Sequence, residues 1–141
     1  MELKEILSIV GRPGLYRFVA QSRHGLIVEP LGGGARFAVP VVGNVSALSD
    51  ISMYMENGDL PLSEVFSTML AQEARIAACD LSSAEAARTL YGELFPSYDP
   101  HRVKDKHILK AFHWFSLLRS NGMERFTPEP SSSDNTPSSE S

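Results

Sequence analysis

Three histidines, His101, His107 and His113, recur at intervals of six residues in a segment with a helical pattern. Imidazole groups bind a metal or transfer protons when they converge on one point. On a helix, a step of six residues turns the side chain by about 240°, so these histidines point in three directions. His24 lies far away in a predicted turn. We therefore expect no zinc site, and we expect solvent-facing histidines with one packed beside Trp114.

Cys79 is the single cysteine and lies among alanines. A catalytic thiol needs a lowered pKa and a histidine close in space, whereas an isolated cysteine in such a context is typical of a small buried filler. The glycines at 32–34 lack the residues that complete a phosphate loop or a dinucleotide fingerprint, and a turn explains them. The sequence predicts no catalytic residue and no cofactor. An enzyme stays an alternative that requires a cleft with perturbed ionisable groups.

A basic ridge is the best candidate for a binding surface. Arg102, Lys106 and Lys110 are spaced i, i+4, i+8, with His113 and the aromatic Trp114 beside them. Such a ridge can hold an acidic protein surface or a nucleic-acid backbone. It can also be the solvated face of an amphipathic helix, or it can pair with the acidic segment 61–100 or with the acidic tail. We take these five residues as the candidate interaction surface.

Charge is distributed unevenly along the 141 residues. The sequence has 13 Lys and Arg against 17 Asp and Glu, a net charge of −4. Residues 101–123 carry five basic groups and one acidic group. An acidic protein thus contains one basic segment, which describes a surface and not a fold.

The ridge belongs to the last of three predicted helices. Proline, capping residues and apolar stripes at helical spacing predict one helix over about 61–71, a second from Ser82 to Pro96 and a third from about Asp99 to Ser120. The predicted core positions are Leu62, Val65, Phe66, Met69 and Leu70 in the first helix, Ala87, Leu90, Tyr91, Leu94 and Phe95 in the second, and Ile108, Phe112, Phe115 and Leu118 in the third.

The first part of the chain is rich in short strand patterns. Runs at 15–21, 26–29, 36–39 and 51–55 are separated by Gly, Pro and Asn turns, and residues 3–7 fit a short helix or an edge strand. Four or five such strands predict a small antiparallel barrel or a strongly bent sheet. From Thr127 the sequence is Ser, Pro and acid rich, which predicts a disordered tail.

Several classes are excluded by composition. No apolar run reaches the roughly 18 residues of a membrane-spanning helix, and the start, MELKE, lacks the pattern of a signal peptide. One cysteine forms neither an internal disulfide nor a C-x-x-C site. We therefore expect a cytoplasmic protein with no membrane partner.

Two stretches resemble an uncharacterised bacterial, Bacteroidetes-type family of small cytosolic proteins with a domain of unknown function. The first stretch consists of residues 1–9 (MELKEILSI), Gly14-Leu15-Tyr16 and residues 45–51 (VSALSDI). The second consists of residues 95–99 (FPSYD) with Arg102, Val103, Ile108, Lys110 and Trp114. The resemblance covers about residues 1–118. It implies no activity, cofactor or catalytic residue, but it implies that the β part and the helices work as one unit.

The sequence thus predicts an α+β protein. Its parts are a β-barrel-like or bent-sheet module over 1–58, a three-helix module over 59–123 and a disordered tail over 124–141. We expect a non-catalytic interaction or adaptor protein that binds an acidic partner surface, with a protein partner or a homodimer. The alternative is a nucleic-acid- or ribosome-associated protein that uses the basic helix with Arg17, Arg23 and Arg36.

Overall fold

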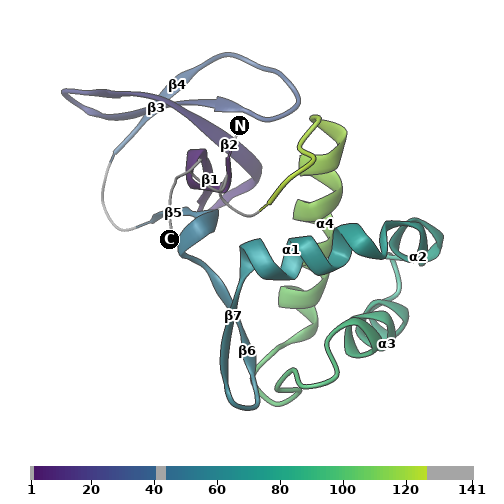
Figure 1. The fold of residues 1–141 in the computed structure, drawn as a ribbon. Coiled ribbons are helices and arrows are strands. Elements are labelled where there is room, and N and C mark those ends of the chain that lie inside the picture. The colour runs from purple at the N-terminus through teal and green to yellow at the C-terminus, as the bar shows by residue number, and fades with distance from the viewer. Residues whose placement is uncertain (1, 41–43, 127–141) are drawn as a thin grey trace, which may run out of the picture.

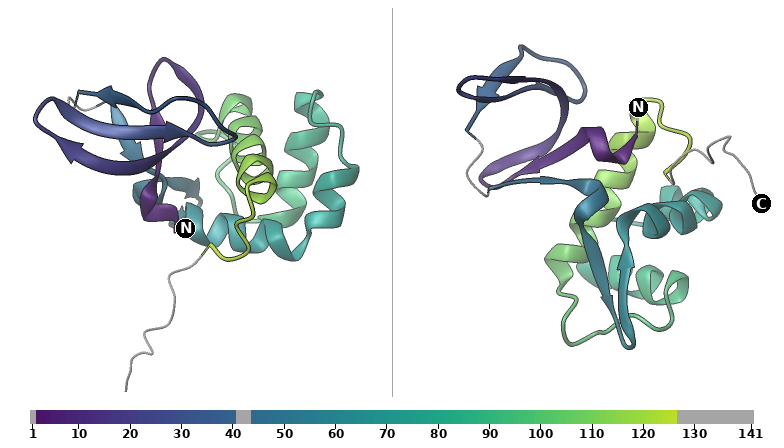
Figure 2. Two further views of the ribbon diagram at one scale, coloured as in Figure 1. Left: turned by 90° about the horizontal axis from the view of Figure 1, so that it is seen from above. Right: turned by 60° about the vertical axis from the view of Figure 1, so that its left-hand side comes forward.

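The computed structural model describes residues 2–40 and 44–126 and shows an α+β fold (Figure 1). Within those residues the elements are, in chain order, η1 (Leu3–Glu5), β1 (Ile6–Ile9), β2 (Arg12–Ser22), β3 (Gly25–Pro30), β4 (Phe37–Val39), β5 (Val45–Ala47), η2 (Leu48–Asp50), β6 (Ser52–Met55), β7 (Gly58–Pro61), α1 (Leu62–Ala71), α2 (Glu73–Ala78), α3 (Ala84–Leu94) and α4 (Asp105–Ser120). The sheet lies at one end of the molecule, and α4 lies between it and α3 (Figures 1 and 2).

Five antiparallel strands form the larger sheet in the order β4-β3-β2-β1-β5. Register shifts in the β1–β2 and β2–β3 pairs mark irregular positions, and such bulges increase the local twist. The described strands leave β4 and β5 as edges, so the predicted module is a bent open sheet and not a closed barrel. Gly25 closes the predicted β2–β3 hairpin, where φ is +137° and a Cβ would collide with the carbonyl of Val39.

The two faces of the sheet pack in different clusters because side chains alternate along a strand. Ile6 and Leu15 join the main core beneath the helices. Leu7, Tyr16 and Val28 belong to a smaller cluster on the sheet, where the ring of Tyr16 meets that of Phe37 edge-on at 5.6 Å. The sheet therefore contributes to the main core and also has a small core of its own.

The strand predicted at 51–55 pairs with β7 and not with the larger sheet. A two-residue turn, Glu56-Asn57, reverses the chain at once, so Tyr54 faces Asp59 across the hairpin. The outer edge of β6 is also bonded: Asp99 N–H donates to Tyr54 O at 3.2 Å. The hairpin β6–β7 begins beside the first turns of α4 and extends past the N-terminal end of that helix (Figures 1 and 2).

The apolar stripes predicted for the helices are confirmed, but the helix count and one boundary are different. The described residues form four α-helices, because α1 ends at Ala71 and, after Gln72, the chain continues as the short α2. The last helix begins at Asp105 and not at Asp99. Asp99 does cap the chain, since its Oδ1 accepts from the backbone N–H groups of His101 and Arg102, but it caps a separate turn.

The main core continues past α4 into the C-terminal segment. Phe126 is 3% exposed, and its ring lies 5.4 Å from that of Phe66 and 5.7 Å from that of Phe115. Phe126, the third residue of the tail predicted over 124–141, is thus packed on the core. The part of that tail from 127 onward lies outside the described residues. The boundary predicted at 58 and 59 stays a prediction. Of the helices described, none has the length and apolar character needed to cross a membrane.

Candidate interaction surface and groove

The five predicted surface residues lie on α4 and on the turn before it. Lys106, Lys110 and His113 are exposed on α4. Trp114 is partly buried and packs on the main core. Arg102 precedes the helix, so the predicted ridge is helical only from Lys106 onward.

Arg102 joins the turn to the hairpin. Its Nε donates to Asp99 Oδ2 at 3.0 Å, and its guanidinium carbon lies 4.2 Å from the centre of the Tyr54 ring. The hydrogen bond from Arg102, with those from the backbone of His101 and Arg102, holds the pKa of Asp99 below its ordinary value. Arg102 therefore already has an anion and an aromatic ring as neighbours.

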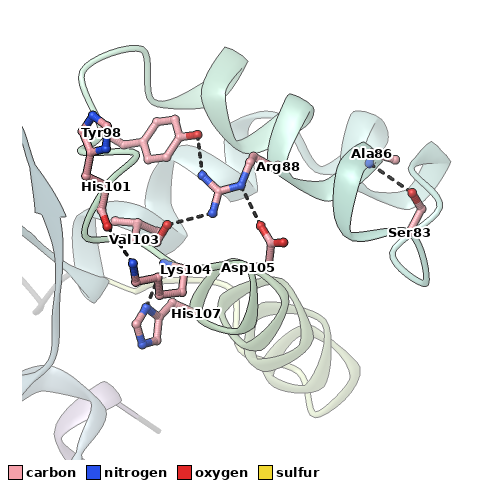
Figure 3. A network of polar contacts seen from close by, with 9 residues as sticks. All are labelled: Ser83, Ala86, Arg88, Tyr98, His101, Val103, Lys104, Asp105 and His107. Atoms are coloured by element: carbon pink, nitrogen blue, oxygen red, sulfur yellow. Dashed lines mark hydrogen bonds and ion pairs between the residues drawn. The ribbon is translucent and has the colours of Figure 1, made fainter.

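His107 lies in the first turn of α4, beside Lys104 (Figure 3). The backbone N–H of Lys104 donates to His107 Nδ1 at 3.1 Å. Burial, followed by the charges of Lys106, Lys110 and Lys104, lowers the pKa of His107. Among the described residues no carboxylate forms an ion pair with Lys106 or Lys110, and the ammonium of Lys110 lies 5.7 Å from the centre of the Trp114 ring.

Arg88 on α3 fixes the segment that leads into α4 (Figure 3). It donates to Asp105 Oδ1 at 2.6 Å, to Val103 O at 2.8 Å and to Tyr98 Oη at 3.0 Å. The hydrogen bond to Asp105 raises the pKa of Arg88 above its ordinary value, so the guanidinium is charged. Arg88 belongs to no sequence motif, because its partners lie 10 to 17 residues away and follow no local spacing.

A groove of about 500 Å³ lies between α4 and the hairpin β6–β7. Asp50, Tyr54 and Asp59 line it on the hairpin side, and His107, Lys110 and Trp114 line it on the helix side. Two of the predicted surface residues, Lys110 and Trp114, thus lie on a concavity. His107 and Trp114 both line that concavity, and the packing of a histidine against Trp114 stays a prediction.

The remaining candidates lie elsewhere. Cys79 is half-buried at the end of α2, next to a surface hollow with Ser83 and Glu93, and no histidine lines that hollow. His24 is exposed in the β2–β3 turn, and His101 is exposed in the turn that Asp99 caps. Among the described residues, no histidine lines the hollow beside Cys79, so the histidine partner that a catalytic thiol needs is not found there.

Two family models match, both described as domains of unknown function: DUF5606 over residues 3–48 and DUF6852 over residues 51–118. A solution NMR structure of a structural-genomics target from Bacteroides vulgatus is 31% identical, with 98% of this chain and 99% of that chain covered and a TM-score of 0.68. The chain belongs to this bacterial family. No curated protein matches it.

Membership confirms the family resemblance drawn from the sequence. The similarity to the Bacteroides vulgatus protein covers nearly the whole of both chains, so the sheet and the helices occur together in that relative. The two family models meet between residues 48 and 51, within and just after η2. The family descriptions carry no activity, so a function must be argued from the geometry of this chain.

Proposed function

We propose that the protein is a non-catalytic cytoplasmic interaction protein that binds an acidic surface of a partner protein. The binding face is the exposed side of α4, with Lys106, Lys110 and His113 at its centre and with Trp114 and Arg102 at its border. We call these five residues the basic face.

The observation that carries the proposal is the absence of a counter-charge for Lys106 and Lys110 among the described residues. The two lysines are four residues apart on one helix, where like charges destabilise the helix by a few tenths of a kcal/mol. Arg102 differs, because Asp99 balances it. An acidic partner surface would neutralise a repulsion that the described residues leave uncompensated.

Trp114 adds a second element of recognition. Its ring is partly buried on the core and has the Lys110 ammonium near its face. Tryptophan is enriched among the residues that contribute most of the binding energy at protein interfaces. The basic face thus offers charge for orientation and a fixed ring for contact area.

The test is affinity purification of the full chain from the cells that make it, with and without nuclease. The variant is Lys106→Glu with Lys110→Glu. The matched control is Arg23→Glu with Arg36→Glu, which changes the charge equally on exposed positions of the sheet part. Circular dichroism checks that both variants fold.

A partner that survives nuclease, is lost with the α4 variant and is kept by the control supports the proposal. Binding should weaken as salt rises, because exposed charges are screened. Retention of the same partner by the α4 variant would contradict the proposal. Partners that vanish with nuclease would favour the nucleic-acid alternative, which places Arg23 and Arg36 in the binding surface.

A further inference from the structure

The groove between α4 and the hairpin β6–β7 has a wall of hydrogen-bond donors. His107 Nδ1 already accepts from the backbone of Lys104, so the neutral ring carries its proton on Nε2. Lys110 lies on the same wall, one helical turn further along. This wall therefore offers an N–H group and an ammonium to a ligand that carries an oxyanion.

The opposite wall carries acceptors. Asp50 lies just before the hairpin, Asp59 lies on β7, and both carboxylates are exposed. Within the described residues, neither carboxylate forms an ion pair with Lys110 or with any other cation. The groove thus holds carboxylates on one wall and a cation on the other, with no ion pair between them.

The groove also has aromatic and apolar surface. The rings of Tyr54 and Trp114 line it, and Leu62 contributes from the first turn of α1. A volume of about 500 Å³ falls within the range of roughly 300–1,000 Å³ that is usual for small-ligand sites. A ligand with an apolar portion fits this composition.

We propose that the groove binds a zwitterionic α-amino acid with an apolar or aromatic side chain. Its carboxylate would lie against His107 and Lys110, and its ammonium against Asp59, which faces Tyr54 across the hairpin. A simple anion would meet the carboxylates and a simple cation would meet Lys110, so a molecule with both charges suits the groove best. A residue inside a peptide chain has neither a free α-ammonium nor a free α-carboxylate, so it lacks both charges that the groove would recognise.

The proposal is independent of the proposed function, although Lys110 and Trp114 belong to both surfaces. Lys106 and His113 do not line the groove, and Asp59 does not belong to the basic face. A substitution at Lys106 therefore tests the partner surface alone, and one at Asp59 tests the groove alone.

The experiment is a titration of the full chain with L-phenylalanine, observed through tryptophan fluorescence. The sequence has one tryptophan, Trp114, and it lines the groove, so the emission reports on the site itself. N-acetyl-L-phenylalanine and L-phenylalanine amide each lack one of the two charges. We expect saturable binding of L-phenylalanine, with each blocked analogue about tenfold weaker or more, as the loss of a charged hydrogen bond implies.

Two groove variants and one control complete the test. Lys110→Met and Asp59→Asn should each weaken L-phenylalanine binding by about tenfold, while Lys106→Met should leave it unchanged. All three positions are exposed, so the fold should persist, and thermal unfolding checks this. No response at millimolar L-phenylalanine, equal binding of a blocked analogue, an unaffected Asp59→Asn variant, or tighter binding of a nucleotide such as AMP would each overturn the proposal.

Discussion

A single guanidinium, that of Arg88, ties α3 to the segment 98–105. The substitution Arg88→Lys should destabilise the protein. An ammonium group cannot reproduce the planar guanidinium, which donates to a carboxylate, a carbonyl and a hydroxyl at once. We expect a loss of about 1–2 kcal/mol in the free energy of unfolding, measured by urea denaturation. The control is Arg75→Lys, whose partner Glu93 is exposed, and it should change little. Equal effects of the two changes would contradict this role of Arg88.

Tyr91 is fully buried, and its hydroxyl has no hydrogen-bond partner among the described residues. Burial raises the pKa of that hydroxyl, and the ring itself packs against Phe95 at 4.8 Å. Removing the oxygen by Tyr91→Phe should therefore preserve stability or increase it by about 1 kcal/mol. Tyr16→Phe is the comparison, because its hydroxyl donates to Pro13 O at 3.0 Å and its loss should cost about 1 kcal/mol. A destabilised Tyr91→Phe protein would show that the oxygen makes a contact of value.

The acid sensitivity of the fold should depend on His107. Its pKa lies below the ordinary value of 6.5 in the folded state. As the pH falls below that value, the unfolded chain takes up a proton that the folded chain resists, so stability falls. His107→Gln, whose side chain can still accept from the helix start, should lose less stability than the wild type between pH 7 and pH 5. Denaturation at both pH values checks this, and equal losses in the two proteins would contradict it.

At the scale of elements, local patterns predicted what depends on local sequence. The apolar stripe of α4 identified the buried Phe112 and Phe115 because burial repeats with the helical period. The predicted start of α4 at Asp99 was wrong, because Asp99 followed by Pro100 is typical both of a helix N-cap and of a capped turn. The pairing of β6 with β7 depends on which strands meet in space, which a strand pattern does not encode.

The candidate site was predictable only in part, for the same reason. Lys110 and Trp114 stand on one helix and were found from their spacing. The opposite wall of the groove has Asp50 from the end of η2 and Asp59 from the hairpin, about 50–60 residues before Lys110 in the sequence. Neither carboxylate belongs to a motif, and only the packing of the hairpin beside α4 brings them to the groove.

The C-terminal segment after α4 is a stabilising element through Phe126. The substitution Phe126→Ala removes a ring that packs against Phe66 and Phe115. We expect a loss of about 3 kcal/mol in the free energy of unfolding, as for other buried phenylalanines. Phe18→Ala on β2 is the control, since that ring is 38% exposed, and it should cost clearly less. A small effect at Phe126 would mean that the segment is dispensable.

At the scale of the whole molecule, one core serves both halves of the chain. Ile6, Leu15 and Leu48 from the sheet part pack in the same cluster as Phe66 and Phe115 from the helices. η2 also packs against α1, across the point where the two family models meet. The main core is therefore complete only when both halves are present.

Division of the chain between Asp50 and Ile51 would separate these two halves. Each fragment should unfold without cooperativity by itself, because its apolar face lacks a cover, and mixing the fragments should restore a cooperative transition and the Trp114 emission of the intact chain. Calorimetry of each fragment and of the mixture measures this; a cooperative transition in one fragment alone would refute it.

The shared core also constrains how the two halves can evolve. A mutation that reshapes the fully buried Leu48 must be matched by one across the core, on α1. The two halves would then be inherited as one unit, and a gene carrying only one of them would encode a chain that aggregates.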